Sequence, residues 1–445
     1  MQRPSLCVSL HAGSASVATV FTALLLVLVA MQAAHSAPTH AVTVQVRPEG
    51  GWRLSVGGEP FTVRGVGGIQ HLDTAAAIGA NTIRTWGVDQ IEQKVGGRDL
   101  LDRAHALGLK VVVGLWLQHE RHGFDYDDSA SLERQRADVR AWVRRYRDHP
   151  AVLLWGLGNE MEGFGEAAAH PRIWRELEHL ARIVKEEDPH HPVMTVLANA
   201  ERAKLDALRR FAPSVDIVGI NLYGAAPRIL HLLGEAAWHG PFMLTEFGPP
   251  GPWEVPHTTW DAPIEPLTRD KAALYSLSHH TSVNDAAGRC LGTFCFLWGQ
   301  KQEATSSWFS MFLESGERTP LVDAMETAFT GKTPASPSPE VVAIEAEFAT
   351  KRVVRESVHE VRVVVQNSAP ETLEYTWSVT RESSDRRHGG DREAVPADVP
   401  DTVVRRSGDT ATIRIPSEPG AYRLFVVVRD RSGGGCIENV PFFVE

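Results

Sequence analysis

The chain has 445 residues, of which 45 are basic and 55 acidic, so its formal net charge is −10. Apolar residues make up 43% of the chain and charged residues 22%. This mixture is typical of a globular protein with a full-sized core and excludes a collagen-like or wholly disordered chain. The acidic balance argues against a nucleic-acid binder, which needs a basic surface to neutralise phosphates.

Residues 1–37 have the pattern of a secretory signal peptide. Arg3 precedes an apolar run, Val17 to Met31, that is shorter than the roughly 20 residues a membrane-spanning helix needs. Small residues follow the run and indicate cleavage near Ser36 or Ala37, with an uncleaved anchor as the alternative. No later stretch is long and apolar enough to span a membrane. We therefore expect a secreted or periplasmic protein.

Short apolar segments alternate with amphipathic ones between residues 61 and 331. Residues 38–60, which precede them, have the pattern of a β-hairpin lead-in. The apolar segments suit strands that are covered on both faces, as parallel strands are. They begin at Phe61, Asn81, Lys110, Ala151, Pro192, Val215, Pro241 and Leu291.

The intervening segments have a helical period, clearest in residues 173–188, where apolar residues share one stripe opposite the charges. Gly331 follows the last of them as a C-terminal cap. Eight strands with intervening helices predict an α/β fold, a (β/α)8 TIM barrel over residues 61–331. A doubly wound open sheet is the main alternative, but GVGG at 65–68 lacks the spacing of a phosphate-binding glycine loop.

Residues 332–340 form a Pro/Ser linker. Beyond it, residues 341–445 contain short alternating strands, which predict a small C-terminal immunoglobulin-like β-sandwich. The polar stretch 382–398 predicts a mobile loop. Trp377 and Tyr422 are the aromatic candidates for a sugar platform in this part, although Tyr422 also fits a strand-corner tyrosine that bonds to the backbone. The sandwich is expected to support the barrel or to contact polymer.

Three cysteines remain after removal of the signal: Cys290, Cys295 and Cys436. If Cys290 and Cys295 share one extended strand, five steps of about 3.3 Å place them too far apart for a disulfide. We expect buried thiols that pack as small apolar residues.

Catalytic groups of such a barrel stand at the C-terminal ends of its strands. The predicted strands end in Arg84 and Trp86, His119, Asn159 and Glu160, Asn221 and Tyr223, Glu246, and Trp298. Two carboxylates with an arginine beside them suit cleavage of a glycosidic bond. That reaction needs one protonated carboxyl group to donate a proton and one ionised carboxylate to attack. Arg84 would supply positive charge to Glu246.

Two strand ends carry recognisable motifs, LGNE at 157–160 and TEFG at 245–248. They resemble the retaining β-glycosidases of glycoside hydrolase clan A. The entry GGEPFTVRGVGG followed by GANTIRTWG is similar to the TIM-barrel catalytic domain of glycoside hydrolase family 2 within that clan. The resemblance covers residues 61–331. Full-length family 2 enzymes usually carry sandwich domains ahead of the barrel, whereas here the predicted sandwich follows it.

The resemblance implies roles for individual residues. Glu160 would be the acid/base and Glu246 the nucleophile. Asn159 would bind the sugar 2-hydroxyl, Tyr223 would contact the nucleophile, and Trp298 would form the floor of the −1 subsite.

Long loops are expected to form walls around the mouth. The proline-rich loop 249–268 carries Trp253 and Trp260, whose indole faces suit the apolar faces of sugars. Loops 120–129 and 300–310 would add further walls, the second with Trp308. The cluster of His119, Glu120 and His122 raises the question of a metal ion, but it follows a strand instead of occupying a helix face, and we predict neither a metal nor a cofactor.

These features predict a retaining β-glycosidase that hydrolyses O-glycosidic bonds of an oligo- or polysaccharide by double displacement, with a carbohydrate substrate as its partner. Retention requires carboxyl groups about 5–5.5 Å apart. Two alternatives stay open: a transglycosidase that remodels an extracellular polysaccharide, and a catalytically inactive carbohydrate-binding protein.

Overall fold

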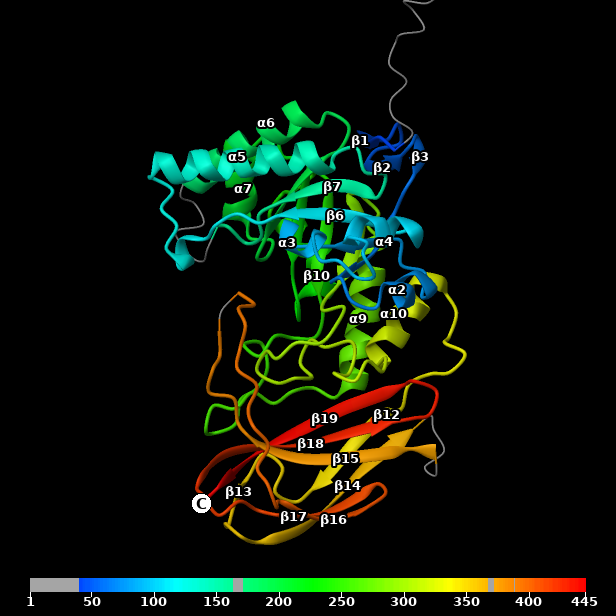
Figure 1. The fold of residues 1–445 in the computed structure, drawn as a ribbon, viewed down its shortest axis with the longest axis vertical. Helices are drawn as coiled ribbons and strands as arrows, with labels where there is room; N and C mark the ends of the chain where they lie inside the picture. Colours follow the sequence, from blue (N-terminus) through cyan, green and yellow to red (C-terminus); the bar gives the residue numbers. More distant parts are fainter. Residues whose placement is uncertain (1–39, 163–170, 367–371, 388) are drawn as a thin grey trace, which may run out of the picture.

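The computed structural model describes residues 40–162, 171–366, 372–387 and 389–445. The signal peptide expected in residues 1–37 lies outside this part of the chain. In the described residues, no helix has the length and apolar character required to cross a bilayer. Figure 1 shows a barrel surrounded by helices above a separate pair of β-sheets.

Eight parallel strands close into a barrel in the order β10-β11-β4-β5-β6-β7-β8-β9. This confirms the predicted (β/α)8 barrel and excludes the open sheet. Each strand falls within a predicted apolar segment or within a residue of one. The strands are β4 (Val63–Gly67), β5 (Thr82–Arg84), β6 (Lys110–Leu115), β7 (Val152–Leu157), β8 (Val193–Leu197), β9 (Ile217–Asn221), β10 (Phe242–Phe247) and β11 (Cys290–Cys295).

Helices cover the outside of the barrel, since the strands are buried on both faces and need apolar partners there. In α6 the stripe predicted around Trp174 and Leu177 is buried. Gly331 ends the last helix with φ of +71°, a left-handed conformation that glycine adopts without strain. The helices are α2 (Leu72–Ala77), α3 (Val88–Ile91), α4 (Leu100–Ala106), α5 (Ser129–Tyr146), α6 (Pro171–Glu187), α7 (Arg202–Phe211), α8 (Ile229–Glu235), α9 (Thr268–Val283) and α10 (Pro320–Thr330), with short 3-10 turns η1 (Glu120–His122) and η3 (Ala226–Arg228).

Apolar side chains close the N-terminal end of the barrel. Strands β1 (Val42–Val46), β2 (Trp52–Val56) and β3 (Glu59–Pro60) form a small antiparallel sheet. Val42 and Leu54 of this sheet pack in one buried cluster with residues at the lower ends of the barrel strands. Catalytic chemistry is therefore confined to the opposite, C-terminal mouth.

The C-terminal part is a β-sandwich of two four-stranded sheets, ordered β12-β14-β17-β16 and β13-β19-β18-β15, around its own core. An immunoglobulin-like type remains a prediction. Tyr422 is buried and its hydroxyl donates to the Glu418 carbonyl, as a strand-corner tyrosine does, and Trp377 is buried in the core, so neither is a sugar platform. The strands are β12 (Glu340–Ala346), β13 (Arg352–Val353), β14 (Val358–Gln366), β15 (Glu374–Arg381), β16 (Val403–Ser407), β17 (Thr410–Arg414), β18 (Gly420–Arg429) and β19 (Gly435–Val444).

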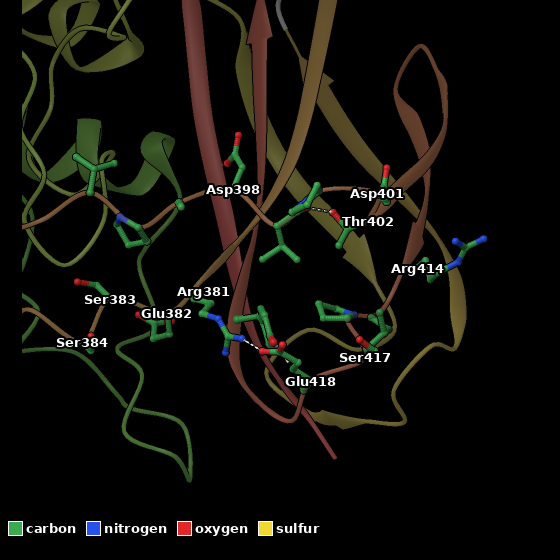
Figure 2. A pocket seen from close by; sticks show the side chains of 18 of the residues that line it. Arg381, Glu382, Ser383, Ser384, Asp398, Asp401, Thr402, Arg414, Ser417 and Glu418 are labelled. Carbon is green, nitrogen blue, oxygen red and sulfur yellow. Dashed lines mark hydrogen bonds and ion pairs between the residues drawn. The ribbon is translucent and has the colours of Figure 1, made fainter.

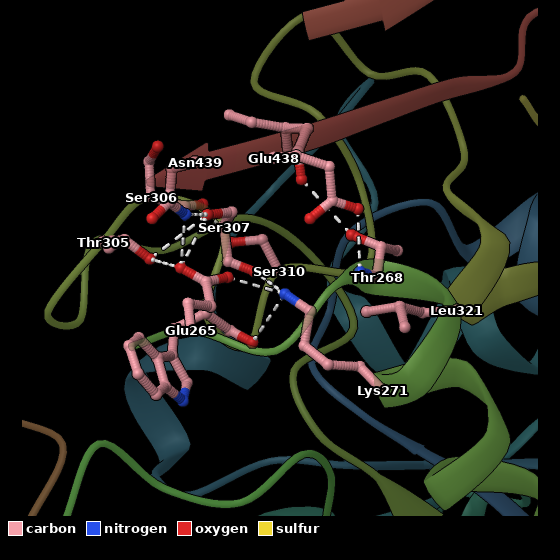
Figure 3. A network of polar contacts seen from close by, with 12 residues as sticks. Glu265, Thr268, Lys271, Thr305, Ser306, Ser307, Ser310, Leu321, Glu438 and Asn439 are labelled. Atoms are coloured by element: carbon pink, nitrogen blue, oxygen red, sulfur yellow. Dashed lines mark hydrogen bonds and ion pairs between the residues drawn. The ribbon is translucent and has the colours of Figure 1, made fainter. Parts of the chain in front are cut away.

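A buried polar network joins the sandwich to the barrel (Figure 3). One oxygen of Glu265 accepts from Lys271 Nζ at 2.7 Å, and the other accepts from Thr305 at 2.6 Å and from Asn439 of β19 at 2.7 Å. Lys271 also donates to the Ser307 carbonyl at 2.9 Å. Because these buried polar groups bond to one another across the boundary, they hold the sandwich against the loops at the barrel mouth.

Cys290 and Cys295 lie at opposite ends of β11, and both are free thiols, as is Cys436. Cys295 and Cys436 are buried, and Cys290 is partly buried.

Candidate active site

The candidate residues converge because the C-terminal ends of parallel barrel strands surround one mouth. Arg84 is the last residue of β5, Asn221 is the last residue of β9, and Glu246 is the second-last residue of β10. Asn159 and Glu160 come just after β7, which ends at Leu157. The polar positions that the sequence placed at strand ends are thus joined in one hydrogen-bonded cluster.

Glu246 is buried and is held by donors on both oxygens. Oε1 accepts from Arg84 Nη1 at 2.8 Å and from Trp86 Nε1 at 2.9 Å, and Oε2 accepts from the Tyr223 hydroxyl at 2.7 Å. The Arg84 guanidinium is 3% exposed, so its charge is compensated within the cluster by this carboxylate. Together these partners stabilise the ionised carboxylate and fix its orientation.

A glycine in the neighbouring strand allows Trp86 to approach. A Cβ atom on Gly114 of β6 would lie 2.3 Å from the Thr85 carbonyl oxygen and 2.4 Å from the Trp86 backbone. Any larger residue at this position would displace the segment that brings the indole to Glu246.

Glu160 has φ of +53°, in the left-handed region that non-glycine residues rarely adopt. Its amide donates to the Val196 carbonyl at 2.9 Å, and its Oε1 accepts from Asn221 Nδ2 at 2.6 Å. Burial of the carboxyl group, followed by the negative charge of Glu246, raises the pKa of Glu160 to about 7. Strained backbone of this kind is concentrated at functional sites.

Asn159 connects the two carboxyl groups. Its Oδ1 accepts from Arg84 Nη2 at 2.6 Å and from Asn221 Nδ2 at 3.2 Å. A chain of hydrogen bonds therefore runs from Glu160 through Asn221, Asn159 and Arg84 to Glu246. Because both bonds use its carbonyl oxygen, the Asn159 amide directs its NH2 group to the other side, where it can donate to a ligand.

A buried ion pair behind the acid/base candidate was not identified from the sequence. Glu162 is 1% exposed, lies 3.2 Å from Lys204 Nζ and accepts from the Ala198 amide at 2.7 Å. Its negative charge also contributes to the raised pKa of Glu160. The position of Glu162 two residues after Glu160 is a signal that could have indicated it, but its buried partner Lys204 comes from α7.

Trp298, expected to form the floor of the −1 subsite, makes its ring contact and its indole hydrogen bond away from the Glu246 cluster. Trp298 is 1% exposed, its indole packs edge-on against Phe312, and its Nε1 donates to the His71 carbonyl. Phe296 instead contacts the rings of Trp86 and Tyr223, at centroid distances of 5.8 and 5.9 Å. The role of Trp298 as the floor of the −1 subsite stays a prediction, and Phe296 is the residue after β11 whose ring contacts reach the partners of Glu246.

The three tryptophans of the loops have different surroundings. Trp253 is 64% exposed and its ring lies 5.9 Å from that of Tyr223, so it stands at the mouth. Trp260 packs against Phe443 of the sandwich, and Trp308 is completely buried with its indole donating to the Pro250 carbonyl. Trp308 therefore supports its loop and offers no face to a sugar, whereas Trp260 is half-buried and its contact with a sugar stays a prediction.

His119 lies on the loop after β6, with its ring against Trp116 and His122. Burial lowers the pKa of His119 to about 4, and its Nε2 has no hydrogen-bond partner among the described residues. No bond joins it to either carboxyl group in that part of the chain. Nor do the described residues contain three His, Cys, Asp or Glu side chains arranged to hold a metal ion.

A cavity of about 630 Å³ lies in the sandwich and not at the barrel mouth. Figure 2 shows it between the start of the 382–402 segment and the turn at Ser417, with Arg381 paired to Glu418 across it. None of the residues around Glu160 and Glu246 lines it. The carboxyl cluster remains the candidate for chemistry.

Comparisons with known proteins also relate the barrel to glycoside hydrolases. Residues 101–223, which include Asn159, Glu160, Asn221 and Tyr223, match the family described as glycosyl hydrolases family 2, TIM barrel domain. A β-glucuronidase of Sus scrofa is 32% identical over 95 residues, 21% of this chain and 13% of that protein. A putative β-glucuronidase of Formosa agariphila is 36% identical over 62 residues, 14% of this chain and 6% of that protein.

Solved structures align over a longer stretch at lower identity. A β-glucuronidase of Bacteroides uniformis is 13% identical with a TM-score of 0.48, covering 91% of this chain and 48% of that one. A putative β-galactosidase of Bacteroides fragilis is 14% identical with a TM-score of 0.46, covering 91% and 57%. The chain thus covers about half the length of these structures and a much smaller share of the curated relatives.

The family match lies on the barrel and contains the LGNE motif and its neighbours. The resemblance that the motifs indicated is therefore confirmed: the barrel of this chain resembles the TIM-barrel domain of the family 2 glycosyl hydrolases.

Proposed function

We propose that the protein is a retaining β-glycosidase that hydrolyses O-glycosidic bonds by double displacement. The observation that carries this proposal is the pair of carboxyl groups joined through Asn221, Asn159 and Arg84 at one barrel mouth. One of them, Glu160, has a pKa raised to about 7, and the other, Glu246, is bonded to a guanidinium. This is the asymmetry that a proton donor and a nucleophile require.

In the first step the Glu246 carboxylate attacks the anomeric carbon as the bond to the leaving oxygen breaks. Glu160 gives its proton to that oxygen, and a glycosyl ester forms on Glu246. In the second step Glu160, now ionised, takes a proton from water, the water oxygen attacks the anomeric carbon, and Glu246 is released. Asn159 is placed to donate its NH2 group to a sugar hydroxyl during both steps.

The electrostatic coupling of the two groups suits this change of role. The negative charge of Glu246 helps to raise the pKa of Glu160, so Glu160 is protonated when the nucleophile is free. Esterification of Glu246 removes that charge. The pKa of Glu160 then falls, and the same group becomes a base when water must be activated.

The names of the curated relatives make a β-glucuronide one substrate to test. The exposed face of Trp253 beside Tyr223 offers a stacking surface for a second sugar, which suits an oligosaccharide. A panel of aryl β-D-glucosides, galactosides, mannosides and glucuronides therefore covers the substrate class.

The test combines this panel with Glu246→Ala. The wild-type enzyme should release at least one aglycone, with retained configuration at the anomeric carbon by proton NMR. Glu246→Ala should be inactive, and added azide should give a glycosyl azide of the opposite configuration. Full activity of Glu246→Ala, or a product of inverted configuration from the wild type, would contradict the proposal.

A further inference from the structure

A further carboxyl group, Glu303, has no role in the mechanism above. Its neighbour Ala304 belongs to the apolar cluster against which Trp86 and Tyr223 pack, and both of these residues donate to Glu246, so Glu303 lies beside the candidate site. It follows β11 on the eighth barrel loop and is paired with Lys301 Nζ at 2.7 Å. Burial, together with the negative charges of Glu393 and Glu246, raises the pKa of Glu303. The side chain of Lys301 is 22% exposed and that of Glu303 is 11% exposed, so each keeps some contact with solvent.

The sandwich holds this loop through residues 389–393, which we call the crossing segment. Lys301 Nζ donates to the Gly390 carbonyl at 2.7 Å, and the Ala304 amide donates to Glu393 Oε2 at 2.7 Å. Glu393 is 5% exposed. The loop around Glu303 is therefore held by the C-terminal part of the chain through the Lys301 side chain and the Ala304 amide.

The crossing segment also reaches the third barrel loop, which follows β6. Arg121 Nη2 donates to the Gly389 carbonyl at 3.3 Å, and Asp391 lies 3.1 Å from His122 Nε2. In Figure 1 the orange segment that follows β15 extends from the sandwich up to the barrel.

In the closed barrel, β4 and β5 lie between β11 and β6. The crossing segment therefore bridges the arc of the mouth from which Arg84 and Trp86 reach Glu246. The Lys301–Glu303 pair lies at the β11 end of this arc.

We propose that Lys301 and Glu303, held in place by the crossing segment, bind hydroxyl groups of the sugar that occupies the site, so that the sandwich takes part in substrate recognition. The inference rests on the proposed glycosidase function. It adds a subsite and a specificity to that function.

The chemistry of the pair favours a neutral sugar over a uronic acid. Lys301 Nζ donates to Glu303 and to the Gly390 carbonyl, so one N–H is left to donate to a sugar hydroxyl, and the Glu303 carboxylate has lone pairs left to accept from one. A uronate carboxylate would need a cation of its own. Lys301, Arg84 and Arg121 each already face a carboxylate, and Glu303 would repel a second one.

The experiment compares wild type and Glu303→Gln with the best neutral substrate of the aryl panel and with its 3-, 4- and 6-deoxy analogues. For the parent sugar, loss of the charged acceptor should lower kcat/KM by about tenfold. For the analogue that lacks the contacted hydroxyl, wild type and variant should be nearly equal. The wild type should also prefer the neutral sugar to its uronide.

Glu317→Gln is the matched control, since Glu317 lies in the same connection between β11 and α10 and pairs with Arg429 of the sandwich. It should leave kcat/KM unchanged for every sugar. The melting temperatures of both variants show that they fold.

A loss in Glu303→Gln that is the same for the parent and all analogues would overturn the inference while leaving the glycosidase function intact. A wild-type preference for the uronide would do the same. Failure of the wild-type enzyme to cleave any glycoside would overturn the proposed function, and this inference with it.

Glu393→Ala tests the contribution of the crossing segment, since it removes the acceptor of the Ala304 amide without touching the mouth. Glu393 is a positioning residue, so KM for the parent sugar should rise severalfold with kcat nearly unchanged. Glu393→Gln, which keeps an acceptor oxygen, should restore most of the affinity. Unchanged KM in the folded alanine variant would contradict a role for the sandwich in recognition.

Discussion

Two buried polar clusters of this molecule have similar components and different surroundings. At the mouth, Arg84 pairs with Glu246, and the nearby Glu160 has a pKa of about 7. Between barrel and sandwich, Lys271 pairs with Glu265, and burial likewise raises the pKa of Glu438 to about 7 (Figure 3). A perturbed carboxyl group beside a buried ion pair therefore occurs in both.

The clusters differ in what their polar atoms face. Glu265 accepts from Lys271, Thr305, Ser307 and Asn439 and is completely enclosed by protein. In the mouth cluster Asn159 directs its NH2 group away from its protein partners, and the exposed Trp253 stands above Tyr223. A raised pKa thus indicates burial, and only an open side with unused donors indicates chemistry. Breaking the first cluster should affect turnover, and breaking the second should affect stability.

The largest effect is expected from Arg84→Met. Glu246 would lose its charged donor and Asn159 one of its partners, so kcat should fall on the order of 10³-fold, as for other preorganised charged donors. Arg289→Met is the control, because Arg289 pairs with Asp285 just ahead of β11, at the N-terminal end of that strand. Steady-state kinetics should show a loss in the first variant only. Equal kcat values in both would remove Arg84 from the mechanism.

Lys271→Met should instead destabilise the fold. Removing the cation leaves Glu265 buried without its charge partner, at a cost of about 3 kcal/mol. Urea unfolding should show this loss. An unfolding free energy equal to that of the wild type would mean that the interface does not depend on this pair.

Glu438→Gln should change how stability depends on pH. Below pH 4.5 Glu438 is protonated in both the folded and the unfolded chain. Between about 4.5 and 7 the unfolded chain loses its proton while the folded chain keeps it, so this group lowers stability as pH rises, on the order of 3 kcal/mol in total. The variant should lack this decline between about pH 4.5 and 7. A parallel decline in both proteins would assign it to other groups.

The smallest effect is the pH dependence of turnover. Because Glu160 must be protonated to act as the acid, kcat/KM should fall about tenfold per pH unit above its pKa of about 7. With an aryl substrate whose leaving group needs no proton, Glu160→Gln should lose this limb. Persistence of the limb in that variant would show that another group titrates.

The sequence predicted the barrel and most of its mouth because charged and amide side chains stand where apolar strands end. Arg84, Asn159, Glu160 and Glu246 were found in this way. Trp298 was expected to form the floor of the −1 subsite from the resemblance alone, and the contacts of Phe296 with Trp86 and Tyr223 were missed because the backbone leaves the regular strand after Cys295.

Other parts of the site depend on how the two halves of the chain meet. Trp260 packs on Phe443, and the amide of Ala304, next to Glu303, donates to Glu393, so in each case the partner is a residue distant in sequence. No local pattern encodes such contacts. Tyr422 was predicted in part, because its bond to Glu418 lies within one strand corner.

The most direct test of the account is to trap the glycosyl enzyme. An activated 2-deoxy-2-fluoro glycoside of the preferred sugar should inactivate the protein, and mass spectrometry of its peptides should locate the sugar on Glu246. Attachment to any other residue, or rapid turnover with an inverted product and no covalent adduct, would contradict the assignment of Glu246 as nucleophile.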